Sequence, residues 1–223
     1  MKAAVCVLAL SPLAALAALA GGSNYGITPG ALPNLAGKVS EWPVPTPRFA
    51  RDPAVAPDGS IYIAVMNGNK IASLDTQTGA IKEYPSSGGP YGLSLDKAGN
   101  VWFCRMGDNK MGKLDPMTGQ MSEVDMGPRS RPRRVATAPD GMLWVALYGN
   151  GKMAKLDPRA MEVVKEYQLP AGDAGPYAVT VDGGGMVWVN EINTDTVVRF
   201  DPKTEQMRVV QLPSNNVGIP ARW

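Results

Sequence analysis

The sequence predicts an all-β protein, a β-propeller built from four-stranded antiparallel blades. Two markers recur together along the chain. The first is an aromatic residue inside a short apolar run, which recurs at intervals of 40, 42 and 44 residues as Tyr62, Trp102, Trp144 and Trp188. The second is an aspartate that recurs at the same intervals, as Asp75, Asp115, Asp157 and Asp201. Because both markers share one drift in spacing, the chain contains four copies of one unit, and units of roughly 40 residues are typical of propeller blades.

Each copy contains four short apolar runs, the number of strands in a propeller blade. In the second copy these runs cover residues 91–96, 100–104, 110–115 and 120–124. Tight-turn sequences such as Pro57-Asp58-Gly59 separate the first two runs, because Gly accepts positive φ and Asp can satisfy its own turn backbone. The second runs are apolar on both faces, which is expected of sheets that stack face to face around an axis.

Incomplete copies flank the four complete ones. Residues 39–43 resemble residues 81–85, which close the first full copy, so they are expected to form outer strands of another blade. Residues 211–219 restart the pattern of residues 168–179. We therefore expect about four full blades plus partial ones, truncated from a larger ring or left as an open arc. An open ring exposes apolar sheet faces, and such faces favour oligomers.

The chain is expected to consist of a signal peptide at residues 1–20, a lead-in or partial blade at residues 21–37 and the propeller domain at residues 38–223. Residues 1–20 combine one early lysine, an apolar stretch and a small-residue site before two glycines, which is the layout of a secretory signal peptide. A membrane anchor is the alternative, but the stretch is rich in weakly apolar Ala and is interrupted by a Ser-Pro pair. Cleavage predicts a periplasmic or secreted protein with no membrane association afterwards.

Composition excludes several kinds of site from this chain. The formal net charge of +2 predicts no nucleic-acid partner. The chain contains no His, so it carries no Ser-His-Asp triad, no His-ligated metal site and no c-type haem motif. Of its two cysteines, Cys6 lies in the expected signal peptide, which leaves Cys104 without an internal disulfide partner. Cys104 lies in an apolar run and is expected to be a small buried residue, not a nucleophile.

Arginines and tyrosines of the blade-entry segments, with two that follow the second runs, are expected to border one face of the central channel. These candidate ligand-binding residues are Arg51, Tyr91, Arg105, Arg131, Arg133, Arg134, Tyr148 and Tyr177. Together they would form a basic, aromatic-lined mouth for the carboxylate, phosphate or aromatic group of a small molecule or peptide. The alternative is that the arginines are solvated loop charges and the tyrosines pack at the rim.

Several blade motifs are similar to those of the streptogramin B lyases, also called virginiamycin B lyases. The matching segments are Pro90-Tyr91-Gly92 and residues 100–103, 112–119 and 166–170, and the resemblance covers about residues 38–219. It implies a propeller enzyme with Mg2+ or another divalent cation as its cofactor. The implied reaction opens a cyclic depsipeptide antibiotic at its ester bond by elimination, which is a carbon–oxygen lyase reaction and a route to antibiotic resistance.

The resemblance also implies a metal site, and this chain departs from it. The family places a Glu three residues after the aromatic marker, where this chain has Val65, Arg105, Leu147 and Glu191. The family pattern Glu-x-His falls on residues 191–193, so the implied metal ligands are Glu191 and Asn193. Asn193 replaces the histidine that moves a proton in the family, and an amide cannot titrate near neutral pH. The catalytic residues of this chain are therefore unassigned by the sequence.

Three functions remain open on the sequence. The first is a lyase-like secreted enzyme, which the repeat and Glu191 favour and the missing histidine opposes. The second is a non-catalytic propeller that serves as a binding or interaction platform and needs no titrating residue. The third is a metal-dependent lactone hydrolase, in which Glu191 and Asn193 would help to hold an ion that activates water.

Overall fold

The structure is a computed structural model that describes residues 40–46, 48–172 and 175–212. The expected signal peptide, the lead-in and nearly all of the C-terminal partial copy lie outside the described residues. Contacts divide the chain into Met1–Glu41 and Trp42–Trp223, and the features described below belong to the second unit. In the described ranges no helix is long and apolar enough to cross a membrane.

Sixteen strands form four antiparallel sheets in the described residues, and within each sheet consecutive strands pair. The first two sheets contain β1 (Ala50–Val55), β2 (Ile61–Val65), β3 (Lys70–Leu74), β4 (Ile81–Pro85), β5 (Pro90–Leu95), β6 (Val101–Arg105), β7 (Lys110–Leu114) and β8 (Met121–Asp125). The other two contain β9 (Pro132–Thr137), β10 (Leu143–Leu147), β11 (Lys152–Asp157), β12 (Glu162–Gln168), β13 (Pro176–Val181), β14 (Val187–Glu191), β15 (Thr196–Phe200) and β16 (Met207–Gln211). A short 3-10 turn, η1 (Met66–Gly68), follows β2.

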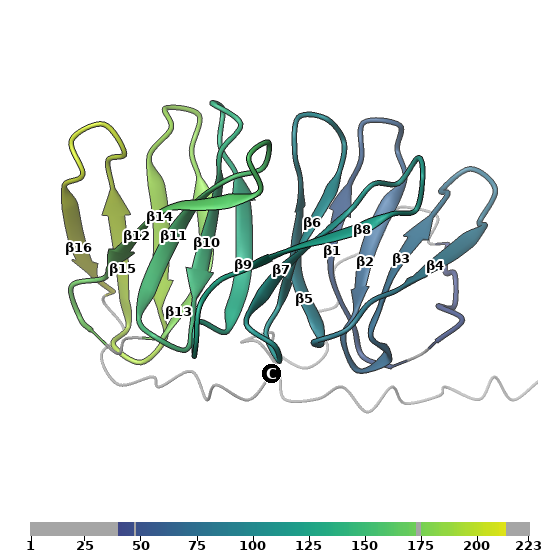
Figure 1. Cartoon of the computed structure of the whole chain (residues 1–223), viewed down its shortest axis with the longest axis horizontal. Helices are drawn as coiled ribbons and strands as arrows, with labels where there is room; N and C mark the ends of the chain where they lie inside the picture. The colour runs from purple at the N-terminus through teal and green to yellow at the C-terminus, as the bar shows by residue number, and fades with distance from the viewer. Residues whose placement is uncertain (1–39, 47, 173–174, 213–223) are drawn as a thin grey trace, which may run out of the picture. The chain divides into compact units, whose positions relative to one another are not determined.

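The sheets follow one another in chain order, from the purple end of the colour scale to the yellow end in Figure 1. The first strand of each sheet contacts the first strand of the next, which joins β1 to β5, β5 to β9 and β9 to β13. These four inner strands are the feature on which the candidate site depends. The arrangement is that of propeller blades, so the predicted fold class of four-stranded antiparallel blades is confirmed.

The sequence repeat is reproduced in the strand register. Each marker tryptophan is paired with a basic residue of the next strand, and each cation lies 5.8 Å from the centroid of the indole ring. The pairs are Trp102 with Lys113, Trp144 with Lys155, and Trp188 with Arg199. The pairing of the second and third strands around each marker is therefore the same in these three blades, and the drift in spacing arises outside it, in part from a bulge in the longer β12.

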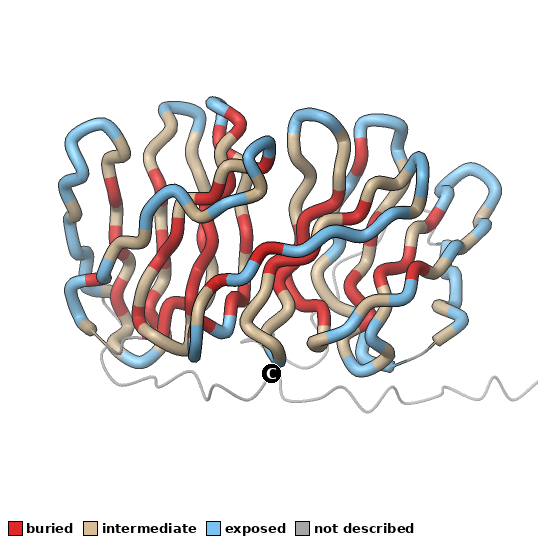
Figure 2. The backbone as a smooth tube through the Cα atoms, viewed as in Figure 1, coloured by how far each residue is buried: buried red, intermediate tan, exposed pale blue. Residues whose placement is uncertain are grey.

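Apolar side chains between neighbouring sheets form three clusters, one at each of the three seams. Figure 2 shows the buried residues concentrated along the inner strands of the sheets, and the exposed ones at the turns and along outer strands such as β8 and β16. Trp144 is only 1% exposed because it lies between the third and fourth sheets against Tyr167 and Phe200. Cys104 is fully buried in this core, and burial raises the pKa of its thiol, so the expectation of a small buried residue is confirmed.

The free energy of unfolding is expected to fall as the solution is acidified, because hydrogen bonds hold turn aspartates in the charged form. A hydrogen bond with Thr118 is the main cause that lowers the pKa of Asp115. The indole N–H of Trp188 donates to Asp182 at 2.9 Å and lowers its pKa in the same way. The unfolded chain then takes up these protons first, so the stabilisation is complete above the unfolded pKa and is lost as the pH falls through the folded pKa.

Denaturant titrations between about pH 6 and pH 2 would measure this loss. Asp115→Asn keeps an acceptor oxygen but cannot titrate, so it should make the dependence on pH shallower. Asp52 has the opposite effect on the pH dependence of stability. Burial raises the pKa of its carboxyl group more than the charges of Arg134, Arg51 and Arg133 lower it. A protein that becomes more stable on acidification would show that this one group outweighs the turn aspartates.

Candidate functional site

The inner strands share an irregularity at their N-terminal ends. In all four sheets the pairing between the first and second strands shifts register near the start of the first strand. The residues that lose their regular partner there include Asp52, Tyr91, Arg133 and Tyr177. A bulge of this kind re-aims a side chain out of the regular alternation of the strand. The four bulges therefore present these four side chains at the same end of the inner strands.

Arg133 lies at the centre of the resulting group. Its guanidinium carbon is 3.9 Å from the ring centroid of Tyr177, 4.7 Å from that of Tyr148 and 4.8 Å from that of Tyr91. Its Nη2 donates a hydrogen bond of 2.8 Å to the Tyr91 hydroxyl. The Tyr91 and Tyr177 hydroxyl oxygens are 3.0 Å apart and share a hydrogen bond. Arg133 is 7% exposed and Tyr91 is 1% exposed, so this contact is made largely out of water.

Two further arginines cover the same rings. The guanidinium carbon of Arg51 lies 3.8 Å from the ring centroid of Tyr91. Arg134 lies over both Tyr91 and Tyr177, at 4.9 and 5.3 Å, and forms an ion pair with Asp52. Arg131 lies 5.7 Å from the ring of Tyr148 at the exposed edge. We refer to these eight residues as the arginine–tyrosine cluster: Arg51, Asp52, Tyr91, Arg131, Arg133, Arg134, Tyr148 and Tyr177.

The cluster carries an excess of positive charge. Its four arginines are accompanied by one carboxylate, that of Asp52, whose φ of 39° is uncommon for a residue with a side chain. Among the described residues, Arg134 alone of the four forms an ion pair. Arg51 has instead the sulfur of Met66 at 3.9 Å, and the Nε of Arg133 is buried without an acceptor. Aromatic faces offset part of the free-energy cost of burying such a cation, but a bound anion would neutralise its charge more fully.

The two bonded tyrosines differ in acidity. Burial is the largest influence on both and raises the pKa of each. For Tyr91 the pKa stays raised, since the hydrogen bond with Tyr177 adds to the effect of burial and the arginines only partly oppose it. For Tyr177 the hydrogen bonds with Tyr91 and Arg133, together with the charges of Arg133 and Arg134, outweigh burial and lower the pKa.

Seven of the eight predicted ligand-binding residues belong to the cluster, and Arg105 does not. Arg105 stands at the end of β6, and its guanidinium is directed to the carboxylates of Asp108 and Glu123 and to the hydroxyl of Ser87. Two acids therefore satisfy its charge within its own sheet. Conversely, the sequence interpretation left out Asp52, the single acid of the cluster. A signal was present, because each bulge lies beside a proline at the strand start, as in Asp52-Pro53 and Pro176-Tyr177.

Glu191 and Asn193, the implied metal ligands, lie at the end of β14 and in the turn that follows it. Glu191 is 1% exposed, and its Oε2 accepts a hydrogen bond of 2.6 Å from the Thr196 hydroxyl. Its Oε1 is buried without a hydrogen-bond partner. Within the ranges that the structure describes, no three or more His, Cys, Asp or Glu side chains are grouped so that they could hold a metal ion. Mg2+ usually keeps several water ligands and is held by one or two carboxylates, so the unpartnered Oε1 of Glu191 offers one such ligand, and Mg2+ stays a prediction.

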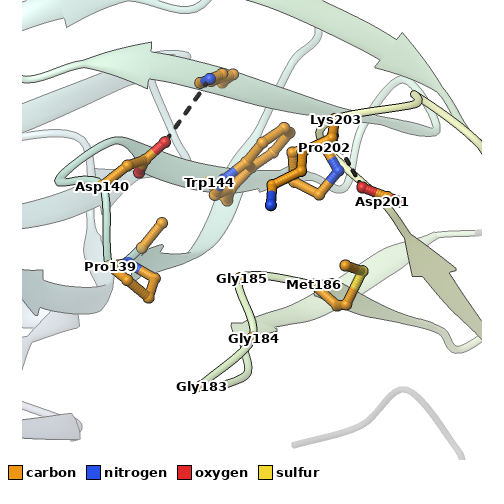
Figure 3. A pocket seen from close by; sticks show the side chains of 12 residues that line it. Pro139, Asp140, Trp144, Gly183, Gly184, Gly185, Met186, Asp201, Pro202 and Lys203 are labelled. Carbon is orange, nitrogen blue, oxygen red and sulfur yellow. Dashed lines mark hydrogen bonds and ion pairs between the residues drawn. The ribbon is translucent and has the colours of Figure 1, made fainter.

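A cavity of about 320 Å³ lies at the opposite end of β13, between the third and fourth sheets (Figure 3). Trp144 and the turn residues Gly183, Gly184 and Gly185 line it, and two of its charged groups, Lys155 and Asp140, pair with each other at 3.9 Å. A cavity of about 340 Å³ occupies the same place between the second and third sheets. The recurrence marks these cavities as gaps between successive blades, so the arginine–tyrosine cluster remains the candidate site.

Comparisons with known proteins agree with the fold. The sequence profile of the Virginiamycin B lyase family matches residues 30–219. The structure of a virginiamycin B lyase from Staphylococcus aureus is 25% identical and superposes with a TM-score of 0.76, covering 82% of this chain and 62% of that one. A streptogramin B lyase structure is 27% identical with a TM-score of 0.76, covering 82% and 61%. No curated protein matches the sequence.

One further structure bears on the chemistry of the relatives. It is a catalytically inactive histidine-to-alanine variant of the Staphylococcus aureus lyase with quinupristin, 23% identical with a TM-score of 0.76, covering 82% of this chain and 62% of that one. The chain described here thus spans about three fifths of the length of these lyases.

Proposed function

The chain belongs to the virginiamycin B lyase family, and we propose that it binds a small molecule or peptide bearing a carboxylate at the arginine–tyrosine cluster. The expected signal peptide would place this binding site in the periplasm or outside the cell. The proposal concerns binding first, because the chain has no histidine and Asn193 occupies the position at which the family resemblance implies one.

One observation carries the proposal. Arg51, Arg131 and Arg133 lie over tyrosine rings and form no ion pair with any described carboxylate. A half-buried or buried guanidinium without a counter-ion is costly, and a planar carboxylate offers it two acceptor oxygens in matching geometry. The tyrosine faces beside these guanidinium groups suit an aromatic or apolar part of the same ligand.

Calorimetric titration with N-acetylphenylalanine would test the proposal, with N-acetylphenylalanine amide as the uncharged comparison. The carboxylate should bind at least about tenfold more tightly than the amide, which corresponds to about 1.4 kcal/mol. Arg51→Met should remove most of that difference, because Arg51 lacks an acidic partner and is only partly buried. Arg208→Met replaces an exposed arginine of β16 and should leave binding unchanged. Equal binding of both probes, or equal effects of both variants, would count against the cluster as a carboxylate-binding site.

Lyase activity on a cyclic depsipeptide is the second candidate, and family membership supports it. The ester carbonyl of a cyclic depsipeptide can accept hydrogen bonds from the arginines of the same cluster. A lactone hydrolase that uses Glu191 and Asn193 has weaker support, because the described residues around Glu191 do not complete a metal site. Mass spectrometry of a streptogramin B depsipeptide separates the two, since elimination opens the ring without adding water and hydrolysis adds one water molecule.

A further inference from the structure

An arginine of the third blade occupies a position that the other blades give to glycine. The inner strands β5, β9 and β13 begin at a proline, and the residue before each proline has a positive φ. Gly89 and Gly175 stand there with a φ of 61°, and Arg131 with a φ of 44°. The N–H of Gly89 donates to Oδ1 of Asn69 at 2.9 Å, and that of Arg131 to Oδ1 of Asn109 at 3.0 Å. The positions are therefore equivalent, and a Cβ is strained in this backbone conformation.

Arg129, two residues earlier, also has a positive φ, of 58°. The residue between the two arginines, Ser130, is fully buried, and its carbonyl oxygen accepts a hydrogen bond from the N–H of Gly149 at 3.0 Å. The serine thus anchors the loop to the third sheet, while both arginines are exposed. Strained residues persist where the surrounding structure holds them, and they are common where a side chain serves a ligand.

The two arginines line a cavity of about 550 Å³ between the second and third sheets. It lies beside the arginine–tyrosine cluster, because Arg131 belongs to both. A Cβ on Gly149 would collide with the carbonyl oxygen of Arg129 and lie 2.9 Å from the side chain of Arg131, so this glycine leaves room for both. The lining residues are Met106, Gly107, Asn109, Arg129, Arg131 and Gly149.

Neither arginine forms an ion pair within the described part of the chain. Asn109 also lines a neighbouring cavity of about 420 Å³, where the acids Asp108 and Asp125 stand. Asp108 is paired with Arg105, and Asp125 accepts a hydrogen bond of 2.7 Å from a backbone N–H. The acids nearby are therefore engaged elsewhere, and the 550 Å³ cavity carries two positive charges.

The cavity and the cluster are joined by one tyrosine ring. The guanidinium carbons of Arg131 and Arg133 lie 5.7 and 4.7 Å from the ring centroid of Tyr148. A ligand whose carboxylate is held in the cluster by Arg133 can therefore extend across Tyr148 towards Arg131 and the cavity.

We propose that this cavity is a second anion subsite, in which Arg129 and Arg131 bind the side-chain carboxylate of an acidic peptide whose terminal carboxylate lies in the arginine–tyrosine cluster. The proposal rests on the proposed binding function and narrows its ligand to the class of diacids. Two guanidinium groups match the two oxygens of a carboxylate. Asn109 uses its Oδ1 for the N–H of Arg131, which leaves its side-chain NH2 group to donate to the same ligand.

Calorimetric titration with two dipeptides tests the subsite. N-acetylglutamylphenylalanine and N-acetylglutaminylphenylalanine share the terminal carboxylate and the phenyl ring and differ in one negative charge. The glutamyl peptide should bind at least about tenfold more tightly, as expected for hydrogen bonds to a charged group. Arg129→Gly should remove this difference and leave the affinity for N-acetylphenylalanine unchanged, because Arg129 lies outside the cluster. Arg208→Met, in the exposed strand β16, should keep the difference.

Thermal unfolding of the same variants separates a role in binding from a role in the fold. Glycine adopts a positive φ freely, so the unfolding midpoints of Arg129→Gly and Arg131→Gly should equal or exceed that of the parent. Both variants should nevertheless lose the preference for the glutamyl peptide. A fall in either midpoint would show that the arginine serves the fold, and it would overturn the proposal.

The outcomes also separate the subsite from the proposed function. If all three probes bind with equal affinity, the subsite is wrong and the carboxylate-binding function stands. If only the glutamyl peptide binds and Arg129→Gly abolishes that binding, the subsite stands and the function proposed for the cluster fails. If none of the probes binds, both are wrong.

Discussion

Replacing Trp144 with alanine should lower the free energy of unfolding by about 3–5 kcal/mol, the range for a large aromatic residue in a core. The indole is 1% exposed and lies 5.4 Å from the ring of Phe200 and 5.6 Å from that of Tyr167, measured between centroids. These contacts join the third sheet to the fourth. Truncation would leave a cavity at the seam, which the two sheets could close only by moving closer together.

Trp188→Ala is the matched control, because Trp188 occupies the equivalent register position one blade later. Its indole is partly exposed and shows no contact with another aromatic ring in the described residues. Denaturant unfolding should therefore show less than half the loss measured for Trp144→Ala. Equal losses would mean that the face of the fourth sheet is covered as fully as the seams between the described blades.

Replacing Gly92 with alanine should destabilise the protein and weaken ligand binding together. A Cβ at this position would lie 2.5 Å from the carbonyl oxygen of Arg133 and 2.9 Å from the Cα of Arg134. These are backbone atoms of the neighbouring inner strand, so β5 and β9 would have to separate. Overpacking of this kind costs about 1–3 kcal/mol, and the shift would displace Tyr91 from Arg133. The glycine of Pro90-Tyr91-Gly92 thus serves the close approach of two blades.

Gly183→Ala provides the comparison for that variant. No atom lies within 4 Å of its added Cβ, so the free energy of unfolding should stay within about 0.5 kcal/mol of the parent. Thermal or denaturant unfolding and the N-acetylphenylalanine titration would be run on both variants. If Gly92→Ala proved as harmless as Gly183→Ala, the close contact of the inner strands would be wrong.

The sheets could be predicted from sequence because their register repeats. Trp102 and Trp144 stand opposite Lys113 and Lys155 in the same ladder position, and such pairs recur with the spacing of the blade. The seams follow from the apolar middle strands, which must be covered on both faces. Differences between equivalent positions, such as the partial exposure of Trp188, depend on which neighbouring sheet is present and have no signal within the repeat itself.

The candidate site could be predicted only in part. Arg133, Tyr91 and Tyr177 were identified because they stand at strand starts that border the channel. Arg105 was expected to border the same channel. Its guanidinium is instead directed to Glu123, which lies two strands away in the same sheet and provides a local counter-ion. The bulges were missed, since an extra residue in a short strand is invisible in an alternation of five or six positions.

Glu191 shows a different limit of what can be predicted from the sequence. Its place three residues after Trp188 could be read from the motif, but its hydrogen bond with Thr196 depends on the pairing of β14 with β15. Whether a carboxylate can hold an ion depends on the other donors that the fold brings near it. Sequence spacing gives no distance between side chains that stand in separate blades.

The most direct test of the central claim, that the arginine–tyrosine cluster is the binding site, is a crystal structure of the protein with N-acetylphenylalanine. The ligand carboxylate should lie within about 2.7–2.9 Å of a guanidinium nitrogen of Arg51 or Arg133, with its ring against Tyr91 or Tyr177. A ligand found instead in the cavity over Trp144, or a cluster left empty at saturating ligand, would contradict the claim.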